Sequence, residues 1–283
     1  GGAHILMPAH IGAFSVCFGK LMYHPDTRSL PFSYLIAYND TMYLVPGRNL
    51  TTVGLYRDIR KWPKRDMRPD SARKSIVNFD WLSPFTVGEI LRGKKILEDL
   101  REASGEDVST YNYHEYVIKN SSLRKGIKYY DIALRIYMGA VLKRHAPVEP
   151  TTTVGTGSWT DISGLLLPEP EEQRIIDDII SGDIDTTEAL TERFEQINAM
   201  YSEYRWAWSY RMIMDYYGFT SLTEENVERV KSDYITARRA WIAEIKKDAA
   251  KEYKLGDVEE EVFSNFNEQL DKEVDFENQK LYM

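Results

Sequence analysis

The spacing of apolar and polar residues changes along the chain, and this change predicts a β-rich beginning followed by long helices. Residues 31–37 and 41–45 are rich in aromatic and apolar strand-forming residues, which favours two strands. Tyr38-Asn39-Asp40 lies between them and favours a tight hairpin, because Asn and Asp tolerate positive φ. Residues 1–55 are therefore predicted to form a β-rich segment.

Two helices are predicted in the middle of the chain. Ser83 is a typical N-cap, Pro84 suits the first helical position, and Gly105 follows the end, so a helix is expected over residues 83–104. A second helix is expected over residues 122–145. Its broad apolar face consists of Ile127, Tyr130, Leu134, Tyr137, Val141 and Leu142.

Three segments interrupt this regular pattern. Residues 56–75 are predicted to be a basic connector punctuated by prolines, and the Tyr-rich residues 106–120 leave helix and strand open. Residues 146–168 combine Pro, Thr and Gly and predict a loop. We therefore expect three parts: residues 1–55, 56–168 and 169–283.

The last part is predicted to consist of long helices with short connections. They are expected over residues 170–181, 186–217 and 223–255, with a final acidic helix marked by Val258, Val262, Phe266, Leu270 and Val274. The second has a heptad-like seam formed by Leu190, Phe194, Ile197, Tyr201, Tyr204 and Trp208. Short connections favour an antiparallel hairpin or three-helix bundle. The expected fold class is α+β, predominantly α.

Charge is unevenly distributed along the 283 residues. The net charge is −8, with an excess of basic residues before residue 150 and of acidic residues after it. This asymmetry predicts two functional surfaces, through which one half docks on the other or copies pair head to tail. An acidic chain repels phosphate at long range, so nucleic acid is not an expected partner.

Cysteine content and hydropathy narrow the class of protein further. The single cysteine, Cys17, excludes an internal disulfide framework and a multi-cysteine zinc site. No apolar run approaches the ~18 residues that a membrane span requires. We expect a cytoplasmic protein with no membrane partner and no metal, and the start at Gly1-Gly2-Ala3 predicts a piece excised from a longer protein.

The strongest candidate for ligand binding is the basic connector. Arg57, Arg60, Lys64 and Arg65 could bind phosphate, and Trp62 offers a flat face for a base or sugar. A nucleotide, a phosphosugar or coenzyme A would suit such a site. A solvated connector, or one that docks on the acidic half by ion pairs, explains the same residues.

Catalytic candidates are few. His24 has a carboxylate, Asp26, close in sequence, and a general base commonly needs such an orienting acid. A hydrogen-bonded surface or core histidine is the alternative interpretation. No Walker loop, HExxH or GxSxG motif occurs.

Several stretches resemble an uncharacterised bacterial family. They are residues 4–16, His24-Pro25-Asp26-Thr27-Arg28, Pro31-Phe32-Ser33-Tyr34 and residues 57–63. The first of them lies in a stretch punctuated by Pro8, Gly12 and Gly19 at close to six-residue spacing, as in turns of a β-solenoid. In that family a left-handed β-helix of hexapeptide repeats, like that of sugar-nucleotide acyltransferases and nucleotidyltransferases, precedes a mostly helical region. The resemblance implies that this chain is the C-terminal half of such a protein.

Two functions remain open at this point. The first is a non-catalytic structural and assembly region whose partners are its own N-terminal solenoid and further copies in a homo-oligomer. The alternative is part of a transferase acting on a nucleotide-linked or phosphorylated sugar, with coenzyme A or a nucleotide sugar as ligand. In that case the basic connector would hold phosphate and His24 would act as the base.

Overall fold

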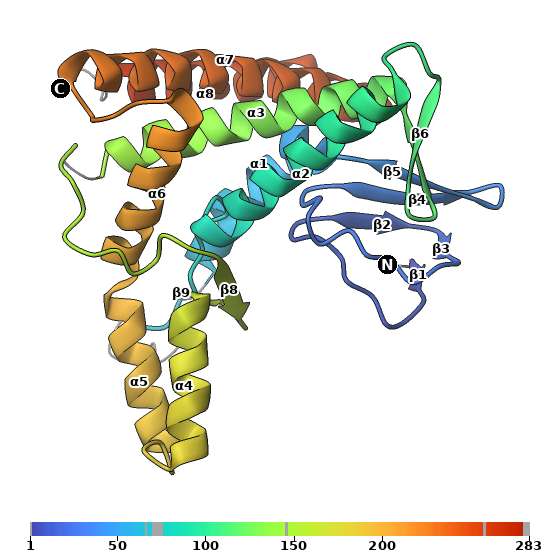
Figure 1. Ribbon diagram of the computed structural model, residues 1–283. Helices are drawn as coiled ribbons and strands as arrows, with labels where there is room; N and C mark the ends of the chain where they lie inside the picture. Colours follow the sequence, from blue (N-terminus) through green and yellow to red (C-terminus); the bar gives the residue numbers. More distant parts are fainter. Residues whose placement is uncertain (1, 66, 70–75, 145–146, 257–258, 280–283) are drawn as a thin grey trace. The chain divides into compact units, whose positions relative to one another are not determined.

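The computed structural model describes residues 2–65, 67–69, 76–144, 147–256 and 259–279 (Figure 1). They form a predominantly helical α+β fold, as predicted. The chain divides into two compact units. The first comprises Gly1–Asp58, Glu89–Ile136 and Asp233–Met283, and the second comprises Ile59–Gly88 and Tyr137–Ser232. Neither unit is one continuous stretch, so the division differs from the predicted limits at residues 55 and 168.

The first unit contains a five-stranded mixed sheet in the order β2-β4-β5-β7-β6. Its strands are β2 (Val16–Phe18), β4 (Tyr34–Tyr38), β5 (Thr41–Val45), β6 (Thr110–Tyr113) and β7 (Tyr116–Lys119). The β4–β5 hairpin is confirmed: Asn39 and Asp40 have φ values of 45° and 58°, as a tight turn requires. The Tyr-rich segment forms the second hairpin, β6–β7, with His114 in the turn at φ 50°.

Residues 4–38 form a coil in which a first pass of the chain, residues 4–18, lies parallel to a second pass, residues 20–38. β1 (His4–Ile5) pairs with β3 (Lys20–Leu21), His10 pairs with Asp26, and β2 pairs with β4. All three pairings are parallel. The partners are 16 to 18 residues apart, and the three sides of the first pass begin six residues apart, at residues 4, 10 and 16.

The turns between the sides of the coil also repeat from the first pass to the second. Phe14 and Phe32 both adopt φ 57°, and their rings stack at 4.9 Å with an angle of 5° between the planes. The Phe32 N–H donates to the Ala13 carbonyl at 2.8 Å. A Cβ on Gly12 would come within 2.7 Å of the Thr27 carbonyl oxygen, so only glycine permits this close approach of the two passes.

Four long helices belong wholly or partly to the first unit. They are α2 (Pro84–Ser104), α3 (Asn120–Leu142), α7 (Glu224–Leu255) and α8 (Glu260–Gln279). The helix predicted over 83–104 is confirmed with its signals, because Ser83 Oγ accepts the Thr86 N–H and Gly105 has φ 86°. Val258 of the predicted last helix lies outside the described residues.

α7 and α8 run antiparallel, as their ion pairs show. Lys246 binds Asp271 at 2.6 Å, and Arg238 binds Glu273 at 3.1 Å, so later positions in one helix meet earlier positions in the other. Leu270 and Val274 lie buried along α8. The predicted antiparallel hairpin is therefore present in the first unit.

The second unit contains a short hairpin and three helices. They are β8 (Trp159–Ile162), β9 (Leu165–Pro168), α4 (Glu169–Ser181), α5 (Thr187–Ala199) and α6 (Tyr201–Tyr217). The predicted loop over 146–168 thus contains two strands. Their core cluster comprises Leu165, Leu167, Ile175 and Ile197.

The single helix predicted over residues 186–217 is wrong. The chain forms α5 and α6, which end and begin on either side of Met200. Ile197 of α5 belongs to the cluster around β9, whereas Trp208 of α6 packs edge-on against Tyr137 at 5.8 Å. The interruption thus separates a residue packed around β9 from one packed on α3, while Tyr201 at the start of α6 still lies against Trp159 of β8 at 5.8 Å.

The predicted connector over residues 56–75 is also partly wrong. α1 (Val53–Lys61) and a 3-10 turn, η2 (Trp62–Lys64), occupy its first half. Thr52 Oγ1 accepts the Leu55 N–H at 3.1 Å and caps the helix. Residues 66 and 70–75 of this segment lie outside the described residues.

Candidate functional site

The first pass of the coil is exposed where the second pass is buried. Leu21 and Leu35 are 1% and 0% exposed, whereas their partners in the first pass, Ile5 and Cys17, are only partly buried. Phe32 is fully buried, whereas Phe14, which stacks on it, is 42% exposed. Leu6, Met7 and Phe18 of the first pass are exposed as well, and so are Met22 and Tyr23 of the second pass. The outer edge of the coil is therefore an apolar surface next to two strands, β1 and β2.

The predicted catalytic pair lies on the second pass. The His24 Nδ1 atom lies 3.2 Å from the Pro8 carbonyl oxygen, while both Asp26 oxygens accept hydrogen bonds from Arg28, at 3.0 and 2.8 Å. The bond from Arg28 lowers the pKa of Asp26. The structure therefore pairs Asp26 with Arg28, and His24 with a backbone carbonyl of the first pass.

The predicted phosphate ligands follow one another along α1 and η2. Arg57 lies 3.3 Å from Asp58 and belongs to the first unit, whereas Arg60, Trp62, Lys64 and Arg65 belong to the second. Trp62 is 53% exposed, and the Arg65 guanidinium lies 5.4 Å from the centre of its ring. Cationic and aromatic groups are thus presented together on the surface of the second unit.

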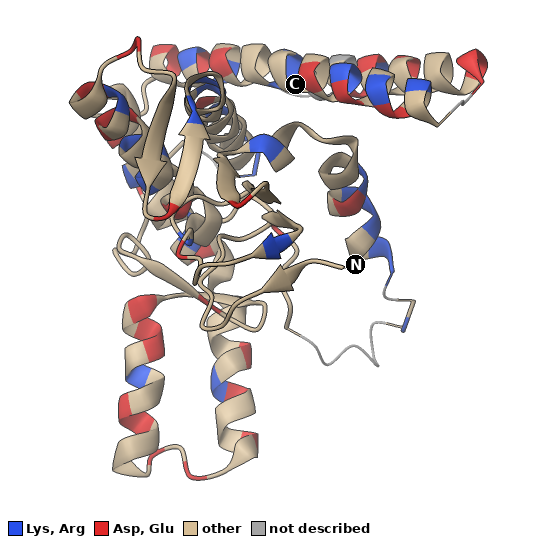
Figure 2. Cartoon of the chain, turned by 90° about the vertical axis from the view of Figure 1, so that its right-hand side faces the viewer, with Lys and Arg blue, Asp and Glu red and all other residues tan. Residues whose placement is uncertain are grey.

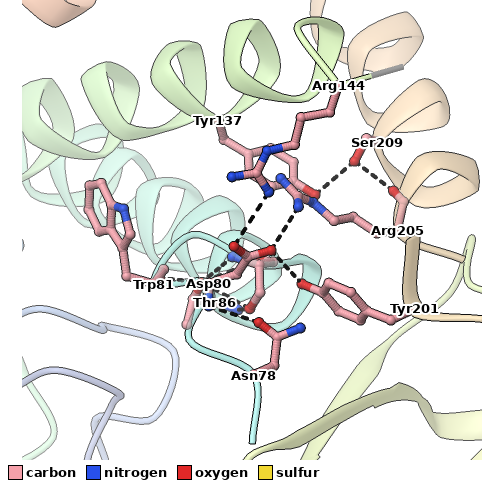
Figure 3. A network of polar contacts seen from close by, with 10 residues as sticks. Asn78, Asp80, Trp81, Thr86, Tyr137, Arg144, Tyr201, Arg205 and Ser209 are labelled. Atoms are coloured by element: carbon pink, nitrogen blue, oxygen red, sulfur yellow. Dashed lines mark hydrogen bonds and ion pairs between the residues drawn. The ribbon is translucent and has the colours of Figure 1, made fainter. Parts of the chain in front are cut away.

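A buried polar network in the second unit was not predicted from the sequence (Figure 3). Asp80 Oδ2 accepts hydrogen bonds from Arg205 Nη1 at 2.7 Å and from the Tyr201 hydroxyl at 3.2 Å. Its Oδ1 lies 3.5 Å from Arg144 Nη1. The side chains of Arg205 and Asp80 are 8% and 25% exposed, so a charged pair lies largely out of water.

The same network continues between α3 and α6. The Tyr137 hydroxyl lies 2.7 Å from Ser209 Oγ, which donates to the Arg205 carbonyl at 2.7 Å. Burial raises the pKa of Tyr137 to about 12 and raises the pKa of Tyr201 further. Both hydroxyls therefore stay protonated at neutral pH and act as hydrogen-bond donors. This arrangement stabilises a joint between segments, and neither tyrosine is poised to act as a base.

The five-stranded sheet carries a shallow hollow on one face. It has a volume of about 370 Å³ and is lined by Ile36, Tyr38, Tyr43, Leu44, Val45, Lys119 and Ser122. The Lys119 ammonium lies 5.3 Å from the centre of the Tyr43 ring. None of the predicted site residues lines this hollow.

Two features are absent from the described residues. No group of three or more His, Cys, Asp or Glu side chains in them is placed to hold a metal ion. None of their helices combines the length and apolar character that crossing a bilayer requires.

Two family models match separate parts of the chain. A domain of unknown function, DUF4954, matches residues 1–101, and another, DUF6819, matches residues 142–280. No curated protein and no solved structure matches the chain significantly. Neither description names an activity, so a functional proposal depends on the geometry of the coil and its surroundings.

Proposed function

We propose that this chain is a structural and assembly region of a larger hexapeptide-repeat protein, located in the cytoplasm. Residues 4–38 would form the last turns of its β-solenoid, and the rest of the first unit would cap that solenoid. In this role the chain supplies no catalysis of its own.

The observation that carries the proposal is the repeat geometry of the coil. Its three parallel pairings have offsets of 16, 16 and 18 residues, and the sides of the first pass begin six residues apart. Three sides of six residues give a turn of about this length, as stacked coils of a solenoid require. The stacked corners at Phe14 and Phe32 extend the same repeat.

The difference in burial between the two passes supports a further coil. The second pass is covered by the first, and β4 continues through β5 into the mixed sheet. Within the described residues, the first-pass strands β1 and β2 each pair with a neighbouring strand on one edge only, β1 with β3 and β2 with β4. A preceding coil would cover Phe14 and Ile5 as the first pass covers Phe32 and Leu21.

The test adds a coil to the full chain. A second copy of residues 3–20, with its cysteine changed to serine, is inserted before residue 3, so Cys17 remains the only thiol. Stacking should raise the unfolding midpoint, protect the β1 and β2 amides from hydrogen exchange and slow the reaction of Cys17 with a thiol reagent. The matched control carries the same insertion with the copies of Ile5 and Val16 changed to proline, which removes strand donors.

An insertion that stays unprotected and leaves the midpoint and thiol reactivity at control values would overturn the solenoid proposal. A second experiment tests the transferase alternative through ligand binding. Nucleotide sugars, sugar phosphates and acyl-coenzyme A are screened for a rise in the unfolding midpoint, and a ligand at 100 times its dissociation constant contributes ~2.7 kcal/mol. A selective rise that Arg60→Glu abolishes would replace the structural proposal with the transferase alternative.

A further inference from the structure

The α4–α5 hairpin of the second unit carries an exposed apolar stripe. Ile176, Ile179 and Ile180 are 42%, 47% and 79% exposed, and their spacing places them on one face of α4. Ile175, which directly precedes Ile176, is 4% exposed and packs in the core around β9. The stripe therefore points away from the hairpin's own core.

Acidic residues outnumber basic ones along both helices of this hairpin (Figure 2). Residues 169–199 contain ten Asp or Glu and only two Arg. Both arginines bind one buried carboxylate: Arg174 pairs with Glu171 Oε1, and Arg193 lies 3.0 Å from its Oε2. Both basic side chains of the hairpin are thus paired within the hairpin itself. Two such acidic hairpins facing each other would repel.

A surface of opposite character lies in the same unit. Residues 61–65, Lys-Trp-Pro-Lys-Arg, contain three basic residues and no acidic one. Trp62 is 53% exposed, with the Arg65 guanidinium 5.4 Å from its ring centre. Both the isoleucine stripe and Trp62 remain exposed, so residues 61–65 do not cover the stripe of their own chain.

We propose that the α4–α5 hairpin of one copy binds residues 61–65 of a second copy. Trp62 would pack on the isoleucine stripe, while Lys64 and Arg65 would meet exposed carboxylates of the hairpin, Asp177 and Asp183. Charge complementarity selects this partner over a second hairpin. The contact does not depend on coil stacking, so either proposal can fail without the other.

The experiment measures self-association of the full chain by sedimentation velocity at ~0.1 M and ~1 M salt, where the screening length falls from about 10 Å to about 3 Å. The hairpin variant is Asp177→Lys/Asp183→Lys, and the connector variant is Lys64→Glu/Arg65→Glu. The control, Glu192→Lys/Glu195→Lys, makes the same charge change elsewhere on the hairpin, at exposed positions of α5.

Wild type should associate at ~0.1 M salt and dissociate at ~1 M salt. Each interface variant should weaken association at least tenfold, the control should weaken it much less, and a mixture of the two interface variants should regain a mixed complex because both contacts are again complementary. Ile180→Gln should weaken association with no change of charge. A wild type that stays monomeric at ~0.1 M salt, or a mixture that regains nothing, would overturn the proposal.

Discussion

Replacing Asp80 with alanine should destabilise the second unit more than any comparable surface change. Asp80 is the only carboxylate among the residues labelled in Figure 3, and it binds Arg205 at 2.7 Å and the Tyr201 hydroxyl at 3.2 Å. The Arg205 side chain is 8% exposed. Asp80→Ala therefore leaves a buried guanidinium without its counter-charge.

The expected loss of stability follows from the burial of each partner. An uncompensated buried charge costs ~3–5 kcal/mol. The contact with Arg144, whose side chain is 57% exposed, contributes at most ~1 kcal/mol. The Tyr201 hydroxyl also loses its acceptor, but these effects share one side chain and are not additive. We expect a total of about 3–5 kcal/mol, dominated by Arg205.

Urea unfolding followed by tryptophan fluorescence is a suitable assay. Five of the six tryptophans, Trp62, Trp81, Trp159, Trp206 and Trp208, belong to the second unit, so the signal reports mainly on it. The control is Asp215→Ala, which removes an exposed ion pair with Arg211 in the same unit and should leave the midpoint unchanged.

A double variant separates the buried charge from other effects. Asp80→Ala/Arg205→Met removes both charges and should recover much of the lost stability, because an apolar replacement of a buried ion pair is often neutral. A loss below ~1 kcal/mol for Asp80→Ala, or a double variant no more stable than the single one, would refute this reasoning.

Three further predictions concern the first unit. Gly93→Ala should destabilise it by ~1–3 kcal/mol, because the new Cβ would overlap the Ser29 carbonyl oxygen and lie 3.0 Å from the Tyr130 ring; equilibrium unfolding measures this. Gly54→Ala, whose Cβ would meet nothing closer than 3.8 Å, should instead stabilise α1 by up to ~1 kcal/mol, and a loss there would contradict the steric argument. Burial would raise the pKa of Glu244, but hydrogen bonds from Lys247 and Lys128 outweigh it and hold the pKa below 4.5. The stability advantage of wild type over Glu244→Gln should therefore be complete above pH 4.5 and disappear as the pH falls through the lowered value; an advantage that persists in acid would exclude this origin.

Local sequence signals predicted the elements whose ends are decided by neighbouring residues. Asn39-Asp40 adopts the positive φ that a hairpin needs, and Ser83 with Gly105 marks the two ends of α2. Each of these signals acts within a few residues. For this reason the fold class and most helix limits could be predicted.

The failures occurred where packing between distant residues decides the local structure. The heptad-like spacing continues through Met200, yet the helix is interrupted there, with Ile197 packed around β9 and Trp208 packed on Tyr137. The first half of the predicted connector became α1 because Thr52 caps it and Leu55 and Tyr56 are buried. The prolines and basic residues that follow favoured a connector in the prediction, and the apolar pair Leu55-Tyr56 was not recognised as part of a helix.

The Asp80 network shows why the polar core escaped prediction. Its partners Tyr201 and Arg205 are 121 and 125 positions away in the sequence, and no motif spacing links them. The one available signal was an acidic residue between Phe79 and Trp81, where an apolar surrounding makes a charge unusual. Such a residue suggests a buried partner but does not say which.

The placement of buried charges favours an architectural role for the described residues. Asp80 pairs with Arg205, Asp248 with Arg48, and Glu171 with both Arg174 and Arg193. Three of these four arginines come from another secondary-structure element, so the pairs join parts of the chain. Each of these carboxylates already has an arginine on at least one oxygen, so it serves as a structural contact. The chain thus uses its buried charges within each unit and leaves apolar surface at the coil edge and on α4, where other chains or coils could bind.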